Sequence, residues 1–184
     1  MAKRDKKTIT LGSGDIFLKV FATTMPTVED LCKEENRLGY IKGGAALEYT
    51  QETYEEKDDL GYVSKIITTS EEALLKCGLL TWNGDTLTKL IERCATSEAA
   101  GKRTTKIGGP GNAQNGYYAI CFHHHDAVDG DLWILIKGRN TAGATLTFSM
   151  DEGTTVEPEF KALPHDEDGT LVELIEEIPT TSGT

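Results

Sequence analysis

The stretch YIKGGAALEYTQETYEEKDDLGYVSKIITTSEEALLKCGLLTW, residues 40–82, decides the fold of this 184-residue chain. It opens with Gly43 and Gly44 and then alternates small or apolar residues with polar ones, the two-residue period of a β-strand. After a charged segment, β-forming residues resume at Tyr62. The pattern predicts a long hairpin with residues 55–61 at its tip. Because that tip is too polar to be buried alone, we expect it to meet water or another chain.

The length of the chain is that of one domain with a buried core. We expect the domain to span residues 11–178, between a flexible charged arm at residues 1–10 and a disordered tail at residues 179–184. The basic start is not followed by an apolar block, so it does not resemble a signal peptide. No run of eighteen apolar residues predicts a membrane span. We therefore expect a soluble protein, made in the cytoplasm, that does not insert into membranes.

The formal net charge is −11, which argues against nucleic-acid binding through phosphate contacts, because such binding needs a basic surface. A protein that DNA merely slides past is still compatible with this charge. The charge is also uneven: residues 151–178 hold ten acidic residues and one lysine, whereas residues 1–7 hold four basic residues and one acidic one. Either head-to-tail contact between like subunits or two solvated faces would explain this distribution.

The four cysteines are widely spaced and form no C-x-x-C pair. This spacing favours reduced, partly buried thiols over a disulfide framework or a structural zinc site. The residues concerned are Cys32, Cys77, Cys94 and Cys121.

Outside the hairpin, the sequence predicts a mainly β, sandwich-like fold with one flanking helix and long loops. We expect strands at residues 15–21, 117–124 and 132–137. Two further strands are predicted from alternation, with Leu146, Phe148 and Met150 inward in one and Val156, Pro158, Phe160 and Ala162 inward in the other. Pro158 has no N–H to donate, which predicts an edge strand or a seam between chains.

Helical signals are fewer. Thr27 followed by Asp30 predicts a capped helical turn that extends to Asn36. A clearer helix starts at Asp85, with an apolar stripe formed by Leu87, Leu90, Ile91 and Cys94. A weak strand near residues 104–107, followed by a mobile loop, is predicted next. Residues 70–80 have both helical and strand features, and the pattern alone leaves the choice open. For residues 171–178 the periodicity fits a helix and a closing strand equally well.

One cluster has the composition of a metal site: residues 123–126, with Asp129 and Asp131 nearby. In a strand His123 and His125 share one side, and two such histidines plus a carboxylate can bind zinc. The sequence places no third ligand, so we favour a polar strand end and expect no metal or cofactor. The glycine-rich residues 108–111 lack the ending of a phosphate-binding loop, and no serine lies in a nucleophile elbow. We therefore expect no enzymatic activity.

Several short motifs, in order, resemble those of the major tail tube proteins of long-tailed (siphovirus-type) bacteriophages. They run from the Lys-Gly-Gly at residue 42 to the ending Glu-Phe-Lys-Ala-Leu-Pro at residue 159, and the likeness extends from Gly12 to about Ile178. The other motifs are Leu47–Thr50, Lys57–Gly61, Leu80–Trp82, Asn83-Gly84, Tyr118–His123, Lys137–Thr141 and Leu146–Phe148.

The resemblance implies a structural virion protein of which six copies close a ring, with inner strands that form a continuous β-barrel. It also leads us to favour a strand at residues 70–80. Rings stack into the tail tube, through which DNA passes into the host without specific binding. The implied partners are the chain itself, the tape measure protein and the tail completion or terminator proteins, and the implied location is the virion tail. An acidic lumen would keep DNA from adhering to the wall.

The resemblance also implies three sets of functional residues. Glu48 and Glu52 are expected to face the lumen, because they lie on the outward register of their strand. The arm residues expected to reach the adjacent ring are Lys3, Arg4, Lys6 and Lys7. The loop expected to stack rings consists of Thr53, Tyr54, Glu55, Glu56, Lys57, Asp58, Asp59, Leu60 and Gly61.

Two alternatives accompany this hypothesis. One is an inner-tube subunit of a contractile tail, a tailocin or a type VI secretion system, which would share the fold. The other is a monomeric ligand- or metal-binding β-domain built around residues 123–131.

Overall fold

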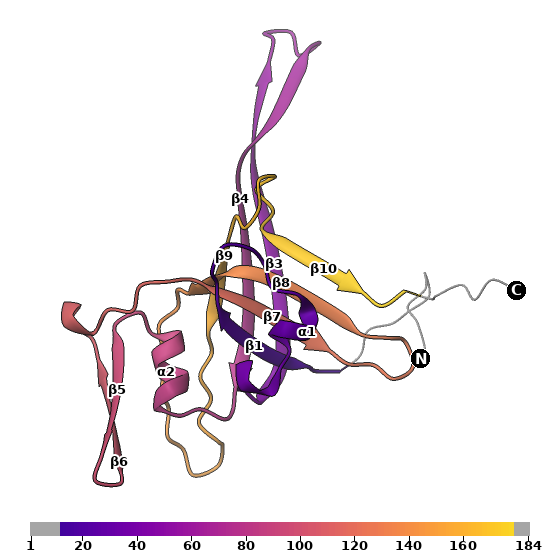
Figure 1. The fold of residues 1–184 in the computed structure, drawn as a ribbon. Coiled ribbons are helices and arrows are strands. Elements are labelled where there is room, and N and C mark those ends of the chain that lie inside the picture. Colours follow the sequence, from indigo (N-terminus) through magenta and orange to yellow (C-terminus); the bar gives the residue numbers. More distant parts are fainter. Residues whose placement is uncertain (1–11, 179–184) are drawn as a thin grey trace, which may run out of the picture.

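The computed structural model describes residues 12–178, which form one eight-stranded antiparallel sheet, a separate two-stranded hairpin and one helix of seven residues (Figure 1). The predicted mainly β class, with a flanking helix and long loops, is confirmed. The sheet has the order β2-β1-β7-β8-β9-β4-β3, and β10 pairs with β8 beside this path. Its strands are β1 (Asp15–Val20), β2 (Arg37–Gly39), β3 (Ile41–Lys57), β4 (Ser64–Leu79), β7 (Tyr118–His124), β8 (Leu132–Asn140), β9 (Glu159–Leu163) and β10 (Val172–Glu176).

The remaining elements lie around this sheet. The separate hairpin pairs β5 with β6, and the longest helix, α2, packs beside it. Their bounds, with those of the short helical turns, are β5 (Cys94–Ala99), β6 (Lys102–Ile107), α1 (Val28–Leu31), η1 (Glu34–Asn36), α2 (Gly84–Leu90) and η2 (Pro110–Asn112).

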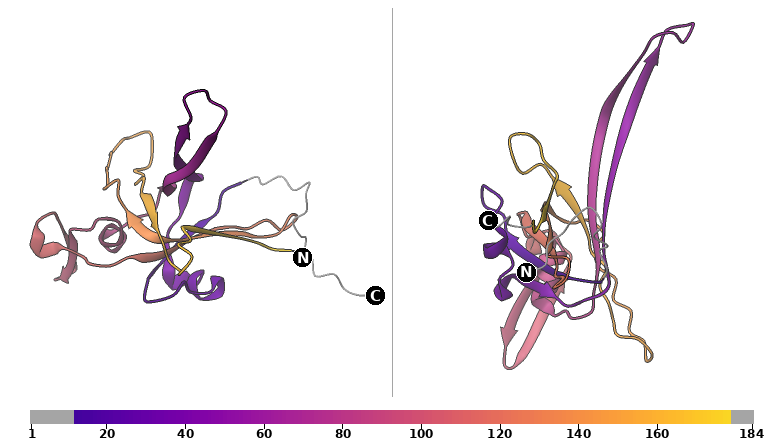
Figure 2. Two further views of the ribbon diagram at one scale, coloured as in Figure 1. Left: turned by 90° about the horizontal axis from the view of Figure 1, so that it is seen from above. Right: turned by 90° about the vertical axis from the view of Figure 1, so that its right-hand side faces the viewer.

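The long hairpin predicted from residues 40–82 is formed by β3 and β4, of 17 and 16 residues. Residues 70–80 are in β4 as far as Leu79, so the strand favoured there is confirmed. Only the lower part of the hairpin joins the sheet, since β9 pairs with β4 at residues 74–76 and with nothing nearer the tip. The upper part projects from the body as a two-stranded ribbon (Figures 1 and 2).

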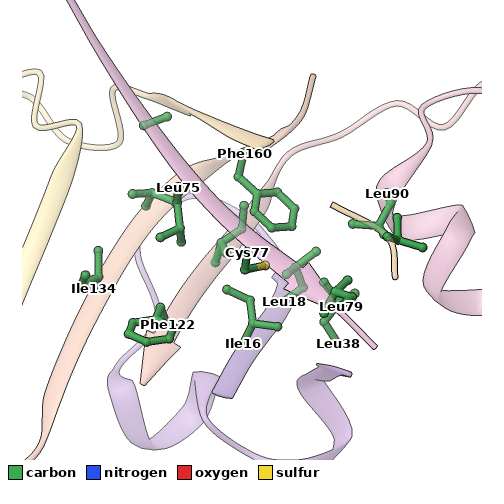
Figure 3. Packing of buried hydrophobic residues seen from close by; sticks show 14 of the residues in the cluster. Ile16, Leu18, Leu38, Leu75, Cys77, Leu79, Leu90, Phe122, Ile134 and Phe160 are labelled. Carbon is green, nitrogen blue, oxygen red and sulfur yellow. The ribbon is translucent and has the colours of Figure 1, made fainter. Parts of the chain in front are cut away.

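The main core lies where the curled sheet packs on itself. Buried side chains of β1 and β7, such as Ile16 and Phe122, belong to the same cluster as Leu75 of β4 and Phe160 of β9 (Figure 3). The predicted sandwich-like packing therefore comes from one sheet that curls. α2 closes one end of this core with two buried leucines, Leu87 and Leu90.

A smaller core lies on the other face of β1, β7 and β8, under α1. It contains Phe17, Leu31, Ala119, Cys121 and Leu135, so both faces of β1 are buried. The predicted cap is confirmed, because the Thr27 side chain accepts a hydrogen bond from the Asp30 amide.

The cysteines are free thiols, as predicted. The sulfur atoms of Cys32 and Cys121 lie 3.6 Å apart in the smaller core. Their hydrogen bond, together with burial, raises the pKa of the Cys121 thiol, and the same hydrogen bond lowers the pKa of Cys32.

The helix after Asn83 is shorter than its apolar stripe predicted. The Asn83 side chain caps it by accepting hydrogen bonds from the amides of Asp85 and Thr86, but it ends at Leu90. Ile91 is already extended, and Cys94 begins β5 and pairs with Ile107. The weak strand near residues 104–107 is confirmed within β6, whereas its partner β5 was not anticipated.

Residues 141–155 contradict the strand predicted from the alternation of Leu146, Phe148 and Met150. They form a loop in which Phe148 is 77% exposed and Met150 102%, while Leu146 alone of the three packs against the main core. No neighbouring backbone is placed to pair with this segment in the described sheet. Alternation without a pairing partner does not make a strand.

The edge position predicted from Pro158 is also wrong. β9 lies between β8 and β4, and Pro158 comes just before it, opposite Cys77 of β4. The proline nitrogen has no N–H, so the pairing with β4 lacks one ladder hydrogen bond at Pro158. Its carbonyl oxygen accepts a hydrogen bond from the Cys77 amide. The predicted inward set is correct, because Val156, Pro158, Phe160 and Ala162 are all buried.

The ambiguous segment at residues 171–178 forms β10, which pairs with β8 from Val172 to Glu176. Gly169 has φ +79° in the preceding turn, a conformation that favours glycine.

Candidate functional site

The upper part of the β3–β4 hairpin is the most exposed region of the described chain, because every residue from Glu48 to Glu71 is exposed. Several of these side chains are large and apolar. At the tip Leu60 is 76% exposed and Tyr62 84%, and Ile66 and Ile67 are exposed on successive positions and hence on opposite faces. Within residues 12–178 no third strand pairs with this ribbon.

The turn at the tip is ordered by one carboxylate. Asp58 Oδ1 accepts a hydrogen bond from the Val63 amide (2.7 Å), and Asp58 N donates to the Val63 carbonyl oxygen (3.0 Å). Gly61 has φ +71° and donates to the Asp58 carbonyl oxygen. The Val63 N–H lowers the pKa of the Asp58 carboxyl. The predicted stacking loop, Thr53–Gly61, therefore divides in two: its first five residues continue β3, and the turn begins at Asp58.

The predicted lumen residues Glu48 and Glu52 lie on the same face of β3, opposite the face that carries Leu47. Both are exposed. Glu48 forms an ion pair with Lys76 (2.9 Å) and this contact raises the pKa of the lysine. Glu52 forms no ion pair within residues 12–178 and accepts a hydrogen bond from Ser70 Oγ (3.0 Å). Their orientation toward a lumen remains a prediction.

Two surfaces that sequence reasoning missed lie at the opposite end of the molecule from the hairpin tip. The β5–β6 hairpin points away from the β3–β4 tip in both side views (Figures 1 and 2), and it exposes Lys102 and Lys106. Arg103 is neutralised by Asp85 (3.0 Å) and Glu98 (2.6 Å). The pair Ala100-Gly101, with positive φ at both residues, was the turn signal that could have revealed this hairpin.

The loop at residues 141–155 reaches the same end as β5–β6 (Figures 1 and 2). It presents the exposed side chains of Phe148 and Met150, and Phe148 contacts Trp82 edge-on with 6.5 Å between ring centroids. One end of the molecule thus carries acidic and apolar groups on β3–β4. The other end carries basic groups on β5–β6, and its loop carries apolar groups together with the exposed acids Asp151 and Glu152.

The histidine cluster at the end of β7 is brought together with one aspartate. His123 Nε2 lies 3.0 Å from Asp131 Oδ2, and His125 Nδ1 lies 2.7 Å from Asp131 Oδ1. His124 points to the other face, is buried and contacts the Ser13 carbonyl oxygen (2.7 Å). Burial alone would raise the pKa of Asp131, but the hydrogen bonds from His123 and His125 outweigh it, and the pKa lies below its usual range.

A second histidine–carboxylate contact joins His165 Nε2 to Glu173 Oε1 (2.8 Å), beside Asp166. The His165 side chain is almost wholly buried, and its Nδ1 has no hydrogen-bond partner.

The predicted inter-ring arm, Lys3, Arg4, Lys6 and Lys7, lies outside the described residues, as does the predicted tail at residues 179–184. Among residues 12–178, none of the helices combines the length and the apolar character that a membrane crossing needs. No protein-family model matches the chain, and no curated protein does so either.

Proposed function

We propose that this chain is a self-assembling structural subunit that stacks head to tail into a tube, in the manner of a major phage tail tube protein, and that DNA passes through the tube. The observation that carries the proposal is the β3–β4 ribbon, whose residues from Glu48 to Glu71 are exposed on both faces. A two-stranded ribbon is at best marginally stable alone in water. A neighbouring subunit would supply the missing contacts.

The apolar side chains of the ribbon make such contacts favourable. Burying a large apolar side chain contributes roughly 1.5–3 kcal/mol. Leu60, Tyr62, Val63 and Ile66 are each more than half exposed, so burial of this group could drive association. Large exposed apolar groups gathered on one element are typical of an interaction surface.

A second copy of the chain is the partner that the charges favour. Residues 51–72 contain seven acidic and two basic residues, whereas residues 94–107 contain three basic residues and one acidic one. These segments lie at opposite ends of the molecule (Figure 2). Surfaces that differ and complement one another produce head-to-tail contacts, which continue from copy to copy.

The charge of the chain also suits a conduit for DNA. A wall of net negative charge repels phosphates, so that a duplex does not adhere. Glu52 supports this role best of the two lumen candidates, since its charge is not paired with a lysine or arginine of the described chain.

Negative-stain electron microscopy of concentrated protein tests the proposal, and hollow filaments or annular rings are expected. A matched variant replaces residues 54–67 with Asn-Gly. This change joins Thr53 to its cross-strand partner Thr68 through a two-residue turn and leaves the body intact. It should give a folded monomer by circular dichroism and size-exclusion mass, and no filaments. Normal filaments from this variant, or a wild-type chain that stays monomeric at every concentration and with tail partners, would contradict the proposal.

Charge exchange tests the head-to-tail contact directly. Glu55→Lys with Asp59→Lys should weaken assembly, and so should Lys102→Glu with Lys106→Glu. Mixing the two variants should restore an acid–base contact at every junction and yield alternating assemblies that neither variant forms alone. Glu167→Lys, an exposed change away from both ends, is the matched control and should assemble normally. Equal assembly of all four proteins would contradict the contact.

A further inference from the structure

We propose that His123, His125 and Asp131 form a binding site for one divalent transition-metal ion of the Zn²⁺ class. This inference does not rest on the proposed function, because it concerns a site within a single copy. The ligand atoms of the three residues all lie within 4.8 Å of one another. Imidazole nitrogens combined with one carboxylate suit Zn²⁺ and its neighbours, whereas Mg²⁺ and Ca²⁺ prefer oxygen ligands.

The strand geometry places both rings without distortion. His123 lies in β7 and His125 directly follows its end, so both side chains point to the same side while His124 turns to the other. Asp131 immediately precedes β8, the antiparallel partner of β7, and therefore lies across from them. Sequence alone left the third ligand open, since it depends on the loop between these strands.

Two of the three ligands, His123 and Asp131, are held by neighbouring groups. The His123 ring stacks on Trp133 with centroids 5.1 Å apart and planes 10° apart. The backbone of Asp131 is paired with that of Glu177, whose amide donates to the Asp131 carbonyl oxygen (3.0 Å). The Glu177 carboxylate accepts a hydrogen bond from the Asp131 amide (3.3 Å). Such outer contacts orient metal ligands and reduce the ordering that binding requires.

Metal binding would exchange protons for the ion. Each close contact between a ring nitrogen and the Asp131 carboxylate in the metal-free protein needs a proton between the two atoms. A divalent ion takes the place of these protons and binds the neutral imidazoles and the carboxylate: a neutral ring keeps its one proton on its other nitrogen, and a ring protonated on both nitrogens releases one proton to water. The His125 side chain is 72% exposed, so water can complete the coordination. Acidification should weaken binding, because protons compete with the ion for the ring nitrogens.

Isothermal titration of the purified full chain with ZnCl₂ tests the site, with Co²⁺ absorption as a spectroscopic readout of nitrogen and oxygen ligands. We expect one ion per chain and a rise in the melting temperature that EDTA reverses. His125→Gln and Asp131→Asn should each weaken Zn²⁺ binding at least ~100-fold. Loss of a residue that only supports a ligand typically weakens metal binding by less than this. His125 is exposed, so its replacement should leave the fold, measured by circular dichroism without metal, unchanged.

Glu173→Gln is the matched control, because it removes the carboxylate partner of the other histidine cluster, at His165. Its affinity for Zn²⁺ should equal that of the unaltered chain. Unchanged binding by His125→Gln would overturn the proposal, as would no binding to the unaltered chain or a loss confined to Glu173→Gln.

Discussion

The sheet body and the projecting ribbon share one strand, β4, and this strand shows how they differ. In the body its alternate side chains Leu75 and Leu79 are fully buried in the main core, whereas nearer the tip Ile66 and Ile67 are exposed on both faces. The strand pairs with β3 in both parts, but only in the body does it also pair with β9. The two parts therefore differ in a packed layer on one face of the strand and in a third strand at its edge. The body supplies that layer itself, and the ribbon requires it from elsewhere.

Truncation of an apolar side chain should change the free energy of unfolding far more in the sheet body than in the ribbon. Phe160→Ala removes a fully buried ring from the main core and should lower the free energy of unfolding by about 3–5 kcal/mol. Tyr62→Ala, at the tip, should change it by less than about 0.5 kcal/mol. Urea denaturation of dilute protein measures both values. A loss for Tyr62→Ala as large as that for Phe160→Ala would show that the ribbon is part of the folded core.

Glycine replacement should give a smaller contrast of the same kind. At Gly138 in β8, an added Cβ would lie 2.1 Å from the Lys161 carbonyl oxygen of β9, so Gly138→Ala should cost about 1–3 kcal/mol in the urea experiment. At Gly61 there is open space, and Gly61→Ala strains only the local backbone because φ is +71°. Hydrogen exchange should then show faster exchange of the tip amides alone. Faster exchange throughout β8 in Gly61→Ala would contradict the separation.

Acid should have the smallest effect, and at the ribbon tip it should act through Asp58. The pKa of Asp58 is lowered in the folded turn, so its contribution is present above the unfolded value of about 3.9 and is lost as the pH falls through the lower folded value. The Val63 amide resonance should therefore shift only below about pH 4. Asp58→Asn should abolish this shift, and Asp59→Asn should leave it in place. A Val63 midpoint near neutral pH would disprove the role of Asp58.

The sequence was sufficient for features that depend on local pattern. The β3–β4 hairpin, the Thr27 cap and the inward set that contains Phe160 followed from alternation and capping, and all are present. The same reasoning failed at Phe148, because its alternation has no pairing strand in the described sheet. It also failed at Pro158, since the neighbours of β9 are distant in sequence.

The candidate sites divide in the same way. That His123 and His125 share a face followed from the period of a strand, but their contact with Asp131 depends on how the connecting loop closes. The basic surface at Lys102 and Lys106 was missed, because its place opposite the ribbon tip is a property of the whole fold. That Glu48 and Glu52 share one face of β3 could be predicted from the period of a strand. What surrounds them in an assembly depends on neighbouring copies of the chain.

Glu48 and Leu74, at the root of the ribbon, form the last pair of the hairpin at which β4 also pairs with β9. Beyond them the ribbon extends for nine residues of β3, from Tyr49 to Lys57, or roughly 30 Å at the usual rise of a strand. Such a ribbon acts as a lever, since each degree of rotation at its root displaces the tip by about 0.5 Å. In a stacked filament, the stiffness of the hairpin at this pair would therefore govern how sharply the filament can bend before neighbouring copies lose contact.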